Sequence, residues 1–63
     1  MCLSAVFKYQ ESPEEAEEVC SNISNFEVAG NTITFTDLLG DEYVLEGAVT
    51  SVDFVKSRIY VAV

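Results

Sequence analysis

The sequence has 63 residues, of which three are basic and eleven are acidic, so its formal net charge at pH 7 is −8. A chain of this length encloses one hydrophobic core, and we expect a single domain over residues 1–63. The hydrophobic content of 49% excludes an intrinsically disordered chain. A domain of this size buries only about 60% of the surface of its unfolded chain. We therefore expect the surplus of apolar residues to be covered by self-association.

The charge balance disfavours nucleic acids and anionic membranes as partners. The three basic residues are Lys8, Lys56 and Arg58, whereas binding to phosphates requires clustered basic side chains. No apolar run approaches the ~20 residues that span a bilayer. The segment Met1 to Tyr9 lacks the length and the basic leader of a secretory peptide. We expect a cytoplasmic protein whose cysteines are reduced.

The first predicted element is a strand over Cys2 to Tyr9. Leu3, Ala5 and Phe7 alternate there with polar residues, which predicts that these three side chains share the buried face.

The acidic stretch over residues 10–20 leaves two interpretations open. Ser12 and Pro13, followed by two glutamates, are typical of a helix start with a capping serine. Few apolar residues could cover an isolated helix in this stretch, however. The alternatives are an acidic loop over about residues 10–18 that leads into a strand at Glu18 to Ser21, or one or two helical turns.

The clearest pattern is a β-hairpin. Strand-like alternation over Ile23 to Ala29 is followed by Gly30-Asn31 and by a second alternating segment, Asn31 to Asp37, in which Ile33 and Phe35 share a face. Glycine followed by asparagine supplies the positive φ that a two-residue hairpin turn needs.

Three further strands are expected after this hairpin. They cover Glu42 to Glu46, Val49 to Val55 with Val52 and Phe54 on one face, and Arg58 to Val63 with Ile59, Val61 and Val63 on one face. The predicted fold is therefore all-β, a small barrel or sandwich of six to seven antiparallel strands that forms a homodimer.

Enzyme chemistry is not expected. The sequence has no histidine and no glycine-rich phosphate loop, because its three glycines stand alone at turns. The glutamate-rich run over residues 14–18 lacks the ligand spacing of a calcium loop. We interpret the acidic side chains as a solvated surface.

Cys2 is the candidate metal ligand. If Met1 is removed, the thiolate and the free amine of Cys2 close a five-membered chelate ring around a metal ion. If Met1 is retained, the Met1 amine, the Cys2 amide nitrogen and the Cys2 thiolate could form fused chelate rings instead. One chain then supplies two or three donors, which is too few for a closed site. Two such chain starts at a two-fold axis would give an N₂S₂ set suited to Ni(II) or Cu(II).

Cys20 leaves three alternatives open. It could form a disulfide with Cys2, act as a third ligand, or remain an ordinary thiol beside the acidic stretch.

Several segments together resemble one family. They are Met-Cys-Leu-Ser at the start, Glu18–Ile23, Phe26–Val28, Gly30–Asp41, Leu45–Gly47 and Ser51–Val55. This combination resembles the CooT family, whose name-giving member is a nickel-binding accessory protein for carbon monoxide dehydrogenase. The resemblance implies an all-β homodimer that holds one Ni(II) between the Cys2 residues of its two protomers. It also implies a nickel enzyme or its maturation machinery as a partner.

Two other functions remain as alternatives. Members of the family have been labelled RNA-binding proteins, and Phe7, Tyr9, Tyr43 and Tyr60 could form a base-stacking platform on a small β-barrel. The net charge of −8 opposes that function. The other alternative is an interaction adaptor without a ligand.

Overall fold

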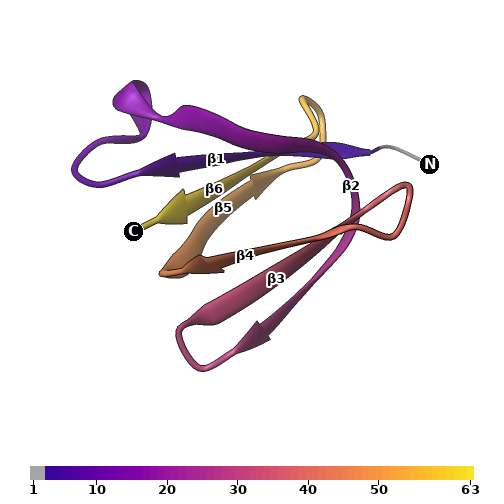
Figure 1. Cartoon of the computed structure of the whole chain (residues 1–63). Coiled ribbons are helices and arrows are strands. Elements are labelled where there is room, and N and C mark those ends of the chain that lie inside the picture. Colours follow the sequence, from indigo (N-terminus) through magenta and orange to yellow (C-terminus); the bar gives the residue numbers. More distant parts are fainter. Residues whose placement is uncertain (1–2) are drawn as a thin grey trace.

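The computed structural model describes residues 3–63 and confirms the all-β class (Figure 1). Within that range the chain forms six strands and one short 3₁₀ helix. In order these are β1 (Ser4–Tyr9), η1 (Pro13–Glu15), β2 (Glu17–Ala29), β3 (Thr32–Asp37), β4 (Glu42–Glu46), β5 (Ala48–Asp53) and β6 (Arg58–Ala62). None of the helical segments in residues 3–63 has the length and hydropathy needed to cross a membrane.

All six strands belong to one sheet in the order β4-β3-β2-β1-β6-β5. Neighbouring strands are antiparallel except β1 and β6, which run parallel with Val6 opposite Ile59. The expectation of a fully antiparallel sheet was therefore wrong. In the described chain the sheet is also not closed into a barrel, because β4 and β5 are its two edges.

The parallel pair follows from a bend inside β2. The first part of this 13-residue strand pairs with β1 as far as Ile23, and the part from Ile23 to Ala29 pairs with β3. Between them the pairing register shifts, and Asn22 adopts a φ of 59°, a left-handed conformation that asparagine tolerates. The bend adds one reversal of direction, so β6 returns parallel to β1 instead of antiparallel to it (Figure 1).

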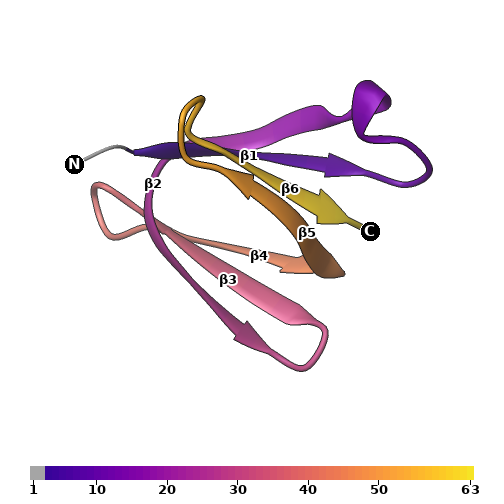
Figure 2. The same cartoon turned by 180° about the vertical axis from the view of Figure 1, so that it is seen from behind.

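The bent sheet folds over its own inner face and encloses the core there (Figure 2). The buried hydrophobic side chains are Val6, Cys20, Ile23, Ile33, Phe35, Ile59 and Val61. The predicted inward face of β3 is thus confirmed. For β6 it is confirmed at Ile59 and Val61, whereas it was wrong for Val63, which follows the end of the strand and is 46% exposed.

The predicted inward face of β1 was wrong. Val6 is fully buried, whereas Phe7 lies half-buried on the other face, where its ring stacks on Tyr60 at 5.5 Å between centroids. Both alternating sets of β1 contain apolar residues, and β1 has a neighbouring strand on each side. Alternation alone could not decide which set faces inward.

The acidic stretch combines parts of both interpretations. Ser12 caps a single 3₁₀ turn, its Oγ accepting a hydrogen bond from the amide of Glu14 at 3.3 Å. Pro13 begins that turn, and β2 already starts at Glu17.

The Gly30-Asn31 hairpin is confirmed. Ala29 pairs with Thr32 across it, and Gly30 has a φ of 61°. A positive φ at the first central residue alone is typical of a type II′ turn.

Gly47 forms the corner that carries the chain from one sheet edge to the other. Its φ is 155°, and its amide donates a hydrogen bond of 2.8 Å to the carbonyl of Asn31. A β-carbon at this position would overlap the carbonyl oxygen of Ala62. β4 and β5 therefore meet at this glycine and diverge from it (Figure 1).

We expect Gly47→Ala to lower the free energy of unfolding by about 3 kcal/mol or more, because the added methyl group overlaps backbone atoms. Gly30→Ala is the matched control, since it also changes a glycine with positive φ but faces open space. It should cost about 1 kcal/mol. Urea unfolding measures both, and equal losses would contradict the role of the corner.

Candidate functional site

The sequence-predicted ligands, Cys2 and Met1, lie outside the described residues. The described chain begins at Leu3, directly before β1. Ser4, the first residue of β1, pairs with Ile23 at the bend of β2. The amide of Ala5 donates a 2.9 Å hydrogen bond to the carbonyl of Ser57 in the β5–β6 loop. The start of β1 thus lies beside both the β2 bend and that loop.

The β3–β4 loop reaches the same end of the molecule (Figures 1 and 2). The amide of Leu38 donates to the carbonyl of Asn22 at 2.9 Å, which joins this loop to the bend. Asp37 organises the loop: its Oδ1 accepts the amides of Leu39 and Asp41 at 2.9 and 3.0 Å, and its Oδ2 accepts the hydroxyl of Tyr43 at 3.1 Å.

These hydrogen bonds shift the pKa values of both Asp37 and Tyr43. Desolvation works to raise the pKa of Asp37, but the hydrogen bonds donated by Asp41, Leu39 and Tyr43 stabilise its charged form, and its pKa lies below the usual 3.8. The hydrogen bond to the Asp37 carboxylate, together with its negative charge, raises the pKa of Tyr43. Asp37 therefore stays ionised at neutral pH and organises the turn through the hydrogen bonds that it accepts.

The β5–β6 loop is built around a second aspartate. Oδ1 of Asp53 accepts the amides of Val55 and Lys56, each at 2.9 Å, and these hydrogen bonds lower the pKa of Asp53. The expected strand over Val49 to Val55 consequently ends at Asp53. Phe54 was predicted to share a strand face with Val52, which is wrong: it lies in the turn, 85% exposed.

A cleft of about 350 Å³ opens between this loop and the bend of β2. It has no charged side chain in its described lining, which is notable in a protein with a net charge of −8. Ser4, the second residue after Cys2, belongs to this lining. The apolar part of the wall is formed by Ile23, Phe26, Val52, Phe54 and Ile59.

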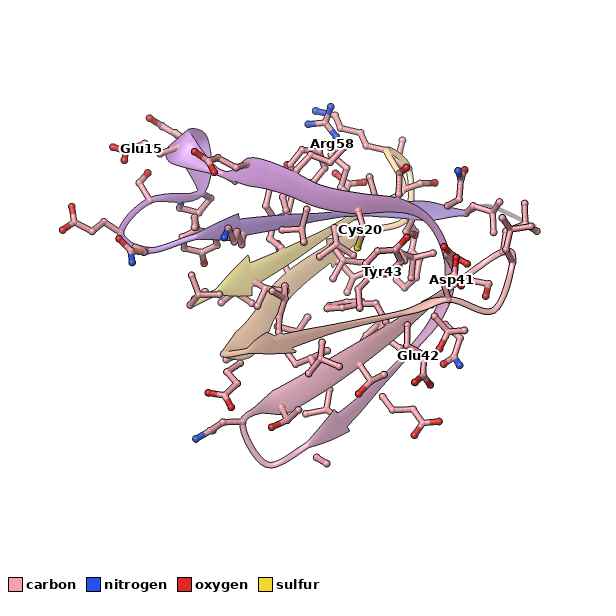
Figure 3. The ribbon with its side chains drawn as sticks, in the orientation of Figure 1. Glu15, Cys20, Asp41, Glu42, Tyr43 and Arg58 are labelled. Atoms are coloured by element: carbon pink, nitrogen blue, oxygen red, sulfur yellow. The ribbon has the colours of Figure 1, made fainter. Side chains whose placement is uncertain are left out.

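Cys20 faces the core beside Tyr43 (Figure 3). It pairs with Val6 in the centre of the sheet. Burial raises the pKa of the Cys20 thiol, and the negative charges of Asp37 and Glu18 raise it further. A buried thiol that keeps its proton is a poor metal ligand, which argues against the third-ligand alternative. The disulfide alternative involves Cys2, which lies outside the described residues.

Residues 3–63 contain no group of three or more Cys, Asp or Glu side chains that could hold a metal ion. The acidic run around η1 is thus a solvated surface in the described chain, with Glu14 and Glu15 exposed.

The aromatic residues do not form one platform. Phe7 and Tyr60 stack on the outer face of the sheet, and the guanidinium of Arg58 lies 5.1 Å from the Phe7 ring centroid. The hydroxyl of Tyr9 donates to Thr50 at 2.8 Å. Tyr43 instead lies opposite the buried Phe35, on the inner face.

A family model described as CO dehydrogenase accessory protein CooT matches residues 1–62 of this chain. The protein belongs to the CooT family. The resemblance found in the sequence is therefore confirmed over nearly the whole chain. The comparison with curated proteins gave no match.

The structure explains why several segments that resemble CooT proteins have their particular residues. Asp37, Gly40 and Asp41 form the β3–β4 turn, in which Gly40 has a φ of 89°. Gly47 of the Leu-Glu-Gly segment forms the corner between the sheet edges. The backbone at these positions requires these residues.

Sequence reasoning missed the exposed pair Phe54 and Val55. The signal was present: an aspartate followed by two apolar residues, lysine and serine is compatible with an aspartate-capped turn as well as with the end of a strand.

Asp37 should make stability depend on pH in the acid range. A carboxylate whose folded pKa is lowered contributes stability above its unfolded pKa of 3.8, and this is lost as the pH falls through the folded value. In Asp37→Asn the free energy of unfolding should therefore decrease less between about pH 4 and about pH 2. Urea unfolding across this range measures the difference. Glu27→Gln, an exposed acid on β2, is the control, and an equally shallow profile in it would contradict the assignment.

Proposed function

We propose that this protein is a non-catalytic accessory protein of CO dehydrogenase that carries nickel. One Ni(II) is held between the Cys2 residues of two protomers in a cytoplasmic homodimer. The observation that supports this proposal most strongly is the family match over residues 1–62, combined with the burial of the other thiol, Cys20.

The choice of Cys2 follows from the donors that the chain offers. The sequence has no histidine and two cysteines, and Cys20 is buried with a raised pKa. Cys2 is then the remaining thiol. Its thiolate, with a nitrogen of Cys2 or Met1, gives the sulfur and nitrogen donors that suit Ni(II) in a planar arrangement.

The need for a second protomer follows from the number of donors. One chain start supplies two or three donors, and no further group of ligands exists in residues 3–63. Two copies related by a two-fold axis supply a full N₂S₂ set. An open, shared site also suits a protein that must release its metal to a client enzyme or to the machinery that assembles it.

A non-catalytic role agrees with the state of the described carboxylates. Asp37 and Asp53 have lowered pKa values because they accept backbone hydrogen bonds in turns. A general base or acid that works near neutral pH needs a pKa moved towards 7.

The test is a nickel titration of the purified protein followed by absorption spectroscopy. We expect a thiolate-to-nickel charge-transfer band that saturates near one ion per two chains. Cys2→Ser should abolish the band and weaken nickel binding by more than about 100-fold, because a direct ligand is lost.

Cys20→Ala is the matched control, since it removes the other thiol and should retain the band. Far-UV circular dichroism checks that both variants keep the β-sheet. If Cys2→Ser binds nickel as tightly as the parent protein, the ligand lies elsewhere and the proposal is wrong.

A further inference from the structure

The open edge of β4 is the part of the described fold that is best suited to bind a partner. Within residues 3–63, β4 has a neighbouring strand on one side only. We infer that the edge over Glu42–Glu46 binds an extended segment of another protein as an added antiparallel strand, with basic side chains on one face of that segment and apolar side chains on the other. This mode of recognition needs no metal and no second copy of this chain.

The hydrogen bonds at the two ends of the β3–β4 pair fix which backbone groups of β4 are already used. The amide of Asp37 donates to the carbonyl of Asp41 at 2.9 Å, and the amide of Gly47 donates to the carbonyl of Asn31 at 2.8 Å. In an antiparallel pair, residues that bond to the neighbouring strand alternate with residues whose N–H and C=O point away from it. Every second residue between Asp41 and Gly47 therefore bonds to β3.

The remaining residues of β4 direct their backbone groups to the open edge. Tyr43 and Leu45 are the residues that bond to β3, because they lie two and four positions after Asp41 in an unshifted register. The N–H and C=O groups of Glu42 and Val44 point the other way. An added strand would form its main-chain hydrogen bonds with these groups.

The side chains of β4 divide into an inner and an outer row. Tyr43 lies opposite the buried Phe35 and faces inward, and Figure 3 shows Glu42 on the opposite side of β4. Alternation places Val44 and Glu46 in the outer row with Glu42. This row reads acid, apolar, acid, and Val44 in its centre is 59% exposed.

The charge of the outer row indicates the chemistry of the partner. None of the three basic residues of the chain lies on β2, β3 or β4. Opposite charges that face each other across two strands stabilise the pair, and like charges destabilise it. A matching strand therefore carries lysine or arginine opposite Glu42 and Glu46 and apolar residues beside Tyr43. The net charge of −8 also attracts a basic segment over longer distances.

The same row disfavours a second copy of the chain on this edge. Two β4 strands that pair antiparallel about a two-fold axis at Val44 would place Glu42 of each copy opposite Glu46 of the other. Both pairs would then be like-charged. The two glutamates thus protect the edge from self-pairing, as edge strands require, and leave it open to a basic strand.

The other edge strand, β5, is less regular. Its register with β6 shifts between Val49 and Ser51, which leaves Thr50 as the extra residue of a bulge. A bulge twists an edge strand and opposes the addition of another strand. β4 pairs with β3 without a shift over all five of its residues. The regular ladder that an added strand needs is therefore offered by β4.

The first experiment titrates isotope-labelled protein with a synthetic peptide whose centre reads Lys-Val-Thr-Val-Lys and follows the amide NMR shifts. The amides of Glu42 and Val44 should shift, because they become hydrogen-bond donors. A peptide with the centre Glu-Val-Thr-Val-Glu should bind about 10-fold more weakly or worse, because both outer pairs become like-charged. Unchanged amides at Glu42 and Val44, or equal affinities of the two peptides, would overturn the inference.

A methylated peptide separates strand addition from attraction by charge alone. A methyl group on the amide nitrogen of the central threonine removes the donor that faces Val44 and should weaken binding about 10-fold. The matched control carries the methyl group on the nitrogen of the next valine, which points away from β4 in an antiparallel pair. This control should bind like the unmodified peptide. If the threonine-methylated peptide also does so, no strand is added.

Val44→Pro tests the same hydrogen bond from the side of the protein. It removes an N–H that points away from β3, so the β3–β4 ladder should persist, whereas peptide binding should fall about 10-fold. Val44→Thr is the matched control, because it keeps the N–H, and it should bind like the parent. Circular dichroism and urea unfolding check the fold of both variants. Undiminished binding by a folded Val44→Pro variant would contradict the inference.

The charge is tested by Glu42→Gln, Glu46→Gln. This double variant should bind the basic peptide about 10-fold more weakly and with a smaller dependence on salt. The matched control is Glu14→Gln, Glu15→Gln, which removes two exposed charges at η1. Equal weakening in both double variants would mean that only the net charge matters, and would overturn the site at β4.

These experiments are carried out without nickel, so they fail or succeed independently of the proposed function. Loss of the thiolate-to-nickel band would leave peptide binding at β4 untouched, and failure of the peptide to bind would leave the nickel role untouched. Shifts of the Glu42 and Val44 amides that grow with protein concentration in the absence of peptide would show a second copy on this edge and overturn the inference.

Discussion

The bend inside β2 is the constraint on which the rest of this structure depends. A single strand pairs with β1 before the bend and with β3 after it, and the left-handed backbone at Asn22 marks the change of direction. Folding the sheet over one face lets a chain of only 63 residues bury Val6, Phe35 and Val61 completely. Two flat hairpins of the same length could not enclose such a core.

The same bend determines which strand ends and loops lie at each end of the molecule. One end holds the Gly47 corner, where the two sheet edges meet. The other end holds the start of β1, the bend itself and both aspartate-capped loops (Figure 1). The start of β1 therefore lies at the same end as the loops that carry the exposed Leu39, Phe54 and Val55.

The environment of Cys20 accounts for its behaviour in this fold. Cys20 faces the core, where burial and neighbouring carboxylates keep its thiol protonated. Its function is to pack, as expected for a small buried thiol. The sequence has no histidine and one other cysteine, so the nickel proposal depends on Cys2.

The sequence by itself determined the all-β class, the Gly30-Asn31 hairpin, the inward positions of Ile33, Phe35, Ile59 and Val61, and the CooT family. Period-two alternation and turn residues are local signals, and they act over a few residues. Only the tertiary structure decided that β6 runs parallel to β1, that Val6 and not Phe7 faces the core, and that Phe54 lies in a turn. Each of these depends on which distant strand lies alongside, a non-local choice that is set by one bend in β2 and is not encoded by alternation.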